Sequence, residues 1–301
     1  MWGRIYVYYY RAPWNRRICA KSTEADPVSV IVGAQVMPKK HLSGFIGKAL
    51  LAIALLGGSN ASAQQRAGAS VAPKGELRVA LIMSNQVLVT RSLDGKLAGV
   101  SVDLANAFGA ELGIPVRLVP YENIVRYNQS IGKDEWDVGF APRDLSRTAQ
   151  LAFSDTFMEV DDSYVARPGS MLSTPDEVDR TGIKVAVTQG SATDGFLSRT
   201  LKNAQIVRLT GGLLSPRDVL SFGRADVYAD YTDIAYRVQA EVPGATVLVA
   251  PFNVVRLSIA VPKSNAAALP IVNAFINDAK RNGLIADAIK RAGLRGARPG
   301  R

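Results

Sequence analysis

The stretch KVAVTQGSATDGFL, residues 184–197, contains a local pattern that recurs along the rest of the chain. Its first part is continuous in apolar residues, and we expect a buried strand over 183–187. The turn Gln189-Gly190-Ser191 follows, and a helix is expected over roughly 193–202. Strand, glycine turn and helix in this order predict one unit of an α/β fold.

The same alternation extends to both sides of this stretch. Gly113 is placed to end one of the helices, and Ser215 is placed to cap another, with Pro216 as its first residue. The sequence predicts further strands at 77–82, 116–121, in the core of 135–140, and at 206–209, 225–230, 246–250 and 256–262. Further helices are expected over 102–112, in the stretch before residue 135, over 266–280 and over 284–291. One more helix is expected to begin at Pro216, and another to end at about Ala240.

The strands and helices form two series, which connect near residues 164–169 and again near 252–263. This arrangement predicts an α/β protein with two lobes and two hinge crossings. Lobe 1 would contain residues 75–165 plus 255–295, and lobe 2 residues 168–252. Ligands of open α/β sheets bind outside the carboxyl ends of the strands, so two facing lobes would form a cleft from their strand-to-helix loops.

The region before the first strand has the order of parts found in secretory signals. Lysines open the segment 37–63, an apolar run over 49–56 follows, and small residues precede an expected cleavage before Gln64. The apolar run is too short to span a bilayer as a stable helix, which makes a membrane anchor the weaker alternative. We therefore expect a soluble, periplasmic product.

Both ends of the chain carry segments outside this scheme. Residues 1–36 are interpreted as an extension from a start codon placed too early, with Met37 as the true first residue. A basic and aromatic patch for a membrane or nucleic acid is the alternative. The polar segment 64–74 and the tail 293–301 are expected to be loosely ordered.

Loss of residues 1–63 would change the chemistry of the chain. Eight basic and two acidic residues would go with them, which lowers the formal net charge from +10 to +4 and weakens the case for nucleic-acid binding. The single cysteine, Cys19, and the single histidine, His41, would also be lost. The exported chain would then have no disulfide, no Cys/His metal site and no Ser-His-Asp or Cys-His catalysis. We expect neither a metal nor another cofactor.

Seven runs of the sequence, taken in order, resemble the family 3 extracellular solute-binding proteins, the polar amino-acid receptors of ABC importers. They are GELRVAL, DGKLAGVSVDLANAFGAELGIPV, WDVGF, LSRTAQLAFSDTF, KVAVTQGSATDGFL, GRADVYAD and LSIAVPK. The resemblance covers almost all of residues 75–292. It implies a two-lobed type II periplasmic binding protein, or Venus flytrap, which is usually monomeric.

The resemblance assigns a role to Arg147. Family members carry an arginine six residues before the Phe of a D-F-S-x-P-Y segment, and Phe153 stands six residues after Arg147. That arginine binds the α-carboxylate of the ligand. A guanidinium suits this role because it stays charged and offers two parallel hydrogen bonds to a carboxylate. A surface arginine in an ordinary ion pair is the alternative.

The turn at Gln189–Ser191 resembles the Q-x-G-[ST]-[ST] loop of the same family, whose donors bind the same carboxylate. Gly190 permits a close approach of the backbone, and the next helix begins with unpaired N–H groups. The resemblance therefore implies ligand contacts at Gly190, Ser191 and Ala192, with Thr193 as the next candidate.

The expected amine end of the site departs from the family pattern. The aspartate that binds the α-ammonium group in relatives corresponds here to Tyr231, which Asp230 and Asp233 flank. Either Asp230 or Tyr231 could contact the ligand. Asn85 occupies a position that is commonly aromatic, and Ala141 lies in a loop usually rich in Ser and Thr.

These residues indicate a protein that captures a small carboxylate-bearing solute, an amino acid or a derivative, by hinge closure and delivers it to the permease of an ABC importer. No nucleic acid partner and no catalytic residue are expected. An enzyme similar to cyclohexadienyl dehydratase on the same fold, and a soluble periplasmic sensor module, remain as alternatives.

Overall fold

A computed structural model describes residues 62–143, 147–210 and 214–301. Residues 1–36 and nearly all of the expected signal segment lie outside the described residues, as does part of the loop before Arg147. Among the described residues, no helix combines the length and the apolar character needed to cross a membrane.

The first group of elements surrounds a parallel sheet. Its helices are α2 (Val100–Leu112), α3 (Ile124–Ser130), α7 (Leu269–Arg281) and α8 (Leu284–Arg291). A 3-10 helix, η3 (Lys263–Ala268), precedes α7. The strands are β1 (Leu77–Ile82), β2 (Thr90–Arg91), β3 (Leu97–Ala98), β4 (Val116–Tyr121) and β5 (Val138–Pro142). Strands β4 and β5 pair in parallel with β1 on either side.

The second group repeats this arrangement. Its helices are η2 (Pro175–Glu177), α4 (Ala192–Thr200), α5 (Pro216–Ser221) and α6 (Thr232–Glu241), and its strands are β7 (Lys184–Thr188), β8 (Gln205–Leu209), β9 (Val227–Tyr231) and β10 (Thr246–Val247). Strands β8 and β9 pair in parallel with β7 on either side.

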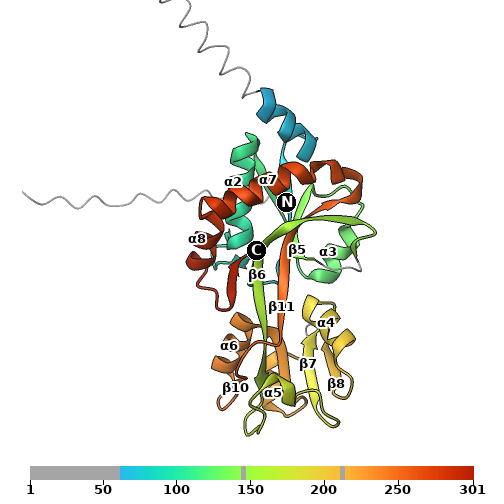
Figure 1. Ribbon diagram of the computed structural model, residues 1–301, viewed down its shortest axis with the longest axis vertical. Coiled ribbons are helices and arrows are strands. Elements are labelled where there is room, and N and C mark those ends of the chain that lie inside the picture. The colour runs from blue at the N-terminus through green and yellow to red at the C-terminus, as the bar shows by residue number, and fades with distance from the viewer. Residues whose placement is uncertain (1–61, 144–146, 211–213) are drawn as a thin grey trace, which may run out of the picture. The chain divides into compact units, whose positions relative to one another are not determined.

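Two long strands, which we call the crossover strands, join the two groups. They are β6 (Leu151–Ala166) and β11 (Asn253–Pro262), and they pair with each other in antiparallel register. Strand β11 also pairs with β5 of the first group, and β6 pairs with β9 of the second. Figure 1 shows both strands running from one group of elements into the other. Strand β6 changes partner at Asp162, just before the connection expected at 164–169.

Successive side chains of the inner strands are buried on opposite faces, which shows that elements cover both faces of each sheet. In β1, Val79 and Leu81 belong to one core cluster, whereas Ala80 and Ile82 belong to another. In β7, Val185 and Val187 pack on one side and Ala186 on the other. The run LRVALI, which is apolar except for Arg78, and the run VAV therefore predicted these strands correctly, because every side chain in them is buried.

Several helix ends follow the local rules applied to the sequence. Gly113 ends α2 in the left-handed conformation, at φ 68°, and its N–H bonds to the carbonyl groups of Ala110 and Gly109. Ser215 caps α5 and accepts a hydrogen bond from the N–H of Asp218, with Pro216 as the first helical residue. Other bounds differ, and the strand expected at 246–250 extends over only two residues.

The expectation of loose ends was wrong. Residues 62–71 are helical, and Val71 and Ala72 are buried in the first core with Ala67 packed against it. At the other end, β12 (Ala297–Pro299) pairs with β6 at Met158–Val160. Arg298 holds it there through bonds from Nε to Glu159 at 3.1 Å and from Nη1 to Asp161 at 2.8 Å. Both contacts are distant in sequence, which explains why local patterns missed them.

Candidate functional site

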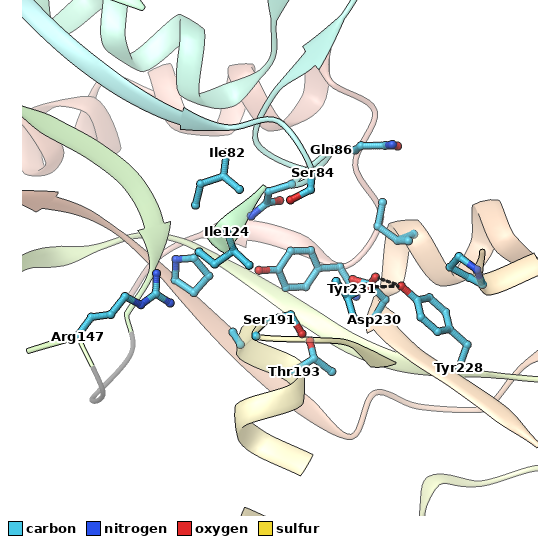
Figure 2. A pocket seen from close by; sticks show the side chains of 17 residues that line it. Ile82, Ser84, Gln86, Ile124, Arg147, Ser191, Thr193, Tyr228, Asp230 and Tyr231 are labelled. Atoms are coloured by element: carbon cyan, nitrogen blue, oxygen red, sulfur yellow. Dashed lines mark hydrogen bonds between the residues drawn. The ribbon is translucent and has the colours of Figure 1, made fainter. Parts of the chain in front are cut away.

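A cavity of about 250 Å³ is lined by residues from both groups of elements (Figure 2). Four of them lie at or beside the carboxyl ends of parallel strands, where ligands of α/β sheets bind: Ile82, Pro142, Thr188 and Tyr231. The others are Ser84, Asn85, Gln86, Ile124, Arg147, Gly190, Ser191, Ala192, Thr193, Pro216, Tyr228, Asp230 and Ile234.

The first turn of α4 forms one wall of the cavity. Ser191 is its N-cap, and the Ser191 hydroxyl accepts a hydrogen bond from the N–H of Asp194 at 3.0 Å. The proton of that hydroxyl is left to donate elsewhere, because the cap uses only a lone pair. In the described part of the chain, no acceptor takes the N–H of Ala192 or Thr193. This turn therefore presents three donors and the positive end of a helix dipole.

Asp194 and Arg208 hold this turn in place. The Asp194 carboxylate accepts the N–H of Gly190 at 3.0 Å and forms an ion pair with Arg208 Nε at 2.9 Å. Gly190 has φ 73°, a left-handed conformation that favours glycine. The Gly190 N–H is thus already engaged, and Gly190 contributes its shape to the cavity wall.

Arg147 reaches the cavity from the other group of elements, shortly before β6. Arg147 is 6% exposed, and Figure 2 shows its guanidinium group directed toward the cavity. The charge of Arg147 lowers the pKa of both Tyr127 and Tyr231, although burial is the larger effect and raises the pKa of each phenol. A fixed cation therefore lies within electrostatic reach of the cavity wall.

The opposite side of the cavity carries an acidic group. The Tyr228 hydroxyl donates a hydrogen bond to Asp230 Oδ2, and the N–H of Tyr231 donates to Asp230 Oδ1 at 2.7 Å. Burial raises the pKa of Asp230, and these two hydrogen bonds oppose the rise. The Tyr228 hydroxyl also lies 3.2 Å from the Thr188 hydroxyl.

Tyr231 extends into the space between these two regions. The residue is 8% exposed, and Figure 2 shows its phenol oxygen pointing toward Ile124. Asn85 faces the Tyr231 phenol, and its side chain partly offsets the raised pKa. The Asn85 Oδ1 atom is buried and has no hydrogen-bond partner among the described residues.

The cavity brings together every site residue expected from the sequence except Ala141. Ala141 is fully buried in β5, where it stands opposite Ser258, and the next residue, Pro142, lines the cavity instead. The reason is the alternation of side chains along a strand, which places residues 141 and 142 on opposite faces.

Among the lining residues that the sequence analysis missed, two had a signal in the sequence. Tyr228 shares a face of β9 with Asp230, since they are two residues apart in a strand. Thr188 ends the strand β7, and the rule on carboxyl ends applies to it directly.

The described residues contain neither histidine nor cysteine, and no group of three or more acidic residues among them is arranged to hold a metal ion. The ionisable groups of the cavity lining are Arg147, Asp230 and the two phenols. Such a set can bind a small molecule that carries both a carboxylate and a cationic group.

Cyclohexadienyl dehydratase of Pseudomonas aeruginosa is 26% identical to this chain over 204 residues, which cover 64% of this chain and 71% of the dehydratase. An amino acid ABC transporter substrate-binding protein from Streptococcus pneumoniae, bound to L-arginine, is 19% identical with a TM-score of 0.62, over 75% of this chain and 97% of that protein. An ancestral amino acid-binding protein, a precursor of cyclohexadienyl dehydratase, is 20% identical with a TM-score of 0.63, over 74% and 98%.

The likeness to solved structures establishes the two-lobed α/β fold of type II periplasmic binding proteins, as the sequence predicted. A family model matches residues 77–293, and the chain belongs to the bacterial extracellular solute-binding proteins, family 3.

Proposed function

We propose that this protein captures a small solute with a carboxylate group, an α-amino acid in the first instance, and delivers it to the permease of an ABC importer. The observation that carries the proposal is the pairing of opposite features in one cavity. Arg147 and the first turn of α4 offer donors, and Asp230 offers an acceptor. An α-amino acid presents a carboxylate and an ammonium group that match these two features.

The carboxylate would lie between Arg147 and α4. The guanidinium provides a planar pair of donors, and the hydroxyl of Ser191 with the N–H groups of Ala192 and Thr193 provides the rest. Because these donors belong to different groups of elements, a ligand that binds both favours the closed arrangement of the lobes. A hydrogen bond joins the two groups of elements directly, from Arg237 Nη1 to Gln86 Oε1 at 3.3 Å, and it supports such closure.

The ammonium group would lie against Asp230, with the Tyr231 phenol beside it. Burial of Asp230 raises its pKa, and a nearby cation would lower it again by favouring the charged carboxylate. Ligand binding would therefore complete the charge balance of the cavity. Tyr231 replaces the acid that relatives carry at the matching position, so Asp230 takes the role of acceptor in this proposal.

A thermal-shift screen of the twenty standard L-amino acids and of small organic acids tests this function. A compound that binds only the folded protein must raise its melting temperature. We expect Arg147→Ala to weaken the binding of any such compound at least about 30-fold, since one partner of a buried charged contact is removed. Arg126→Ala, an exposed arginine of α3 outside the cavity lining, is the matched control.

Equal affinity in the Arg147→Ala and Arg126→Ala proteins would overturn the site assignment. A complete screen without any rise in melting temperature would overturn the proposed ligand class.

Export to the periplasm and a monomeric state belong to the same proposal. The family to which the chain belongs is extracellular, and the expected signal ends before Gln64. The mass of the protein recovered from the periplasm, together with its elution on a sizing column, tests both points. A mature N-terminus well upstream of Gln64 would contradict the signal assignment.

An enzyme related to cyclohexadienyl dehydratase is the second candidate. The identity of 26% to that enzyme and the raised pKa of Asp230 favour it. Loss of water from a cyclic hydroxy acid breaks a C–O bond, and a proton or carbon dioxide leaves another ring carbon to supply the electrons of the new double bond. The leaving hydroxyl needs a proton, which a carboxyl group with a raised pKa can donate. Turnover of a cyclic hydroxy acid by the intact protein, lost in Asp230→Asn, would establish this function; saturable binding without product would exclude it.

A further inference from the structure

Asp162 is a fully buried carboxyl group that does not line the cavity. It lies in the crossover strand β6 at 0% exposure. Its Oδ1 accepts a hydrogen bond from the Thr193 hydroxyl at 3.1 Å, and its Oδ2 accepts one from Asn253 Nδ2 at 2.8 Å. Thr193 belongs to the first turn of α4, and Asn253 begins β11. One carboxyl group thus joins the ligand-binding turn to both crossover strands.

The place of Asp162 in the sheet strengthens this connection. It is the residue at which β6 passes from one partner to the other, because it stands opposite Asn253 of β11 and opposite Tyr231 of β9. Its backbone carbonyl also accepts the N–H of Phe252 at 2.9 Å. Asp162 therefore lies where β6 passes from one group of elements to the other.

Among the described residues, Asp162 differs from the buried acids other than Asp230, since each of those has a cationic partner. Four other acidic side chains are buried to a similar degree. They form the ion pairs Asp137–Arg78, Glu159–Arg298, Asp194–Arg208 and Asp233–Arg237. Asp162 has only neutral donors. A buried carboxylate without a cation is unfavourable, so its retention in the core needs a reason other than stability.

We propose that Asp162 is a positioning residue of the ligand site, whose ionised carboxylate holds the first turn of α4 against the crossover strands and whose protonation loosens that hold. The ionised form accepts both hydrogen bonds at once. A proton on either oxygen competes with one of the two donors, so that Thr193 or Asn253 must reorient.

The charges around Asp162 set the pH range of this change. Burial raises the pKa of Asp162 to about 7; Asp230 and Asp161 add to the rise, and the hydrogen bonds from Asn253 and Thr193 oppose it. The remaining ionisable groups facing Asp162 are the phenols of Tyr164 on β6 and of Tyr228 and Tyr231 on β9. No described Lys or Arg lies within ion-pair distance. The cation of a bound ligand beside Asp230 would favour ionisation of both acids.

The test of this role uses the intact chain without ligand. The amide signals of Ser191, Ala192 and Thr193 are followed by NMR between pH 5 and pH 9. We expect them to titrate with a midpoint near 7 in the unchanged protein and to lose that transition in Asp162→Asn. Asp155→Asn, which changes an exposed acid of the same strand, is the matched control and should titrate like the unchanged protein.

Thr193→Val provides a second, nearly isosteric variant. It removes the donor and keeps Asp162, so the amide of residue 193 should lose its response while the Asn253 side-chain amide still titrates. The proposal is overturned if these signals move alike in the unchanged protein and in Asp162→Asn, or if they move in neither.

A measurement of ligand affinity is the only part of the test that depends on the proposed function. With the L-amino acid that most raises the melting temperature, we expect affinity to increase from pH 6 to pH 8. We expect Asp162→Asn to bind about tenfold more weakly at pH 8 and with little change across this range. Unchanged affinity and pH profile in Asp162→Asn would refute the role in binding. Failure of all twenty amino acids and of the small organic acids would refute the proposed function, and the NMR titration would still decide the role of Asp162.

Discussion

Asp137, which directly precedes β5, and Asp162, which lies within β6, are both buried carboxyl groups, but they have different partners. Asp137 accepts hydrogen bonds from Arg78 Nε at 3.0 Å, Nη2 at 2.7 Å and the backbone N–H at 2.9 Å. Arg78 also binds Asp134, which Lys74 contacts at 2.7 Å. Asp162 has two neutral donors and no cation among the described residues.

The difference separates a structural cluster from one prepared for a ligand. Around Arg78 every charge is compensated within the protein. Lys74 and Arg78 hold the pKa of the exposed Asp134 at about 2, and the acids raise the pKa of Arg78. Around Asp162 and Asp230 burial raises both pKa values, and the negative charge stays uncompensated. An uncompensated acidic region beside a cavity favours a cationic group in that cavity.

The largest expected effect on stability comes from removing Asp137, the buried partner of Arg78. Asp137→Ala would leave the Arg78 guanidinium buried without its main partner, and we expect the free energy of unfolding to fall by about 3–5 kcal/mol. Urea denaturation measures the change. Ligand affinity should stay the same under conditions where the variant is folded, because Asp137 lies outside the cavity lining.

Asp134→Ala is the control for this prediction. It removes an exposed partner of the same arginine, and exposed ion pairs contribute little. Equal losses of stability in the two variants would contradict the distinction between the buried pair and its exposed neighbour.

Removing the charge of Asp162 should have the opposite effect and raise the free energy of unfolding. The folded-state pKa of Asp162, about 7, exceeds the ordinary value of 3.8 that the unfolded chain would show. The unfolded chain therefore releases its proton first, and the contribution of Asp162 to stability decreases as pH rises from about 4 to about 7. Asp162→Asn avoids this loss. At pH 8 we expect the variant without ligand to be more stable than the unchanged protein, by up to about 4 kcal/mol.

Urea denaturation at pH 5 and pH 8 measures this difference between the two proteins. The gain in Asp162→Asn should be largest at pH 8 and shrink toward pH 5. A variant that is less stable than the unchanged protein at both pH values would contradict the uncompensated charge. The combination of a more stable apo protein with weaker ligand binding would identify Asp162 as retained for binding.

The sequence predicted the fold well where information is local. Apolar runs marked the parallel strands, and Gly113, Ser215 and Pro216 marked helix ends, because each rule depends on residues within one turn. It failed at both termini. Val71 and Arg298 find their partners far along the chain, in the first core and in β6, and no window of sequence displays such contacts.

The candidate site likewise contains residues that the sequence predicted and adjoins one neighbour that it did not. The ordered resemblance to the family assembled Arg147, Ser191, Asp230 and their neighbours, which the cavity brings together. Asp162 could not be found in this manner. In the run EVDDSYV two adjacent aspartates look equivalent, and only the strand register turns Asp161 toward Arg298 and Asp162 into the core. The burial of one acid and the pairing of its neighbour are properties of the tertiary structure.

The smallest expected effect comes from the adjacent acid, and it sharpens the comparison further. Arg298→Ala would remove the cation from Asp161 and one of two cations from Glu159, which Arg256 Nε still faces at 3.7 Å. We expect a cost of up to about 1 kcal/mol in unfolding free energy, because Arg298 is partly exposed. The negative charge of Asp161 already raises the pKa of Asp162. Without Arg298 that charge is less compensated, so the NMR midpoint at Thr193 should move to higher pH. An unchanged midpoint would mean that the charges of Asp161 and Asp162 are too well screened to be coupled.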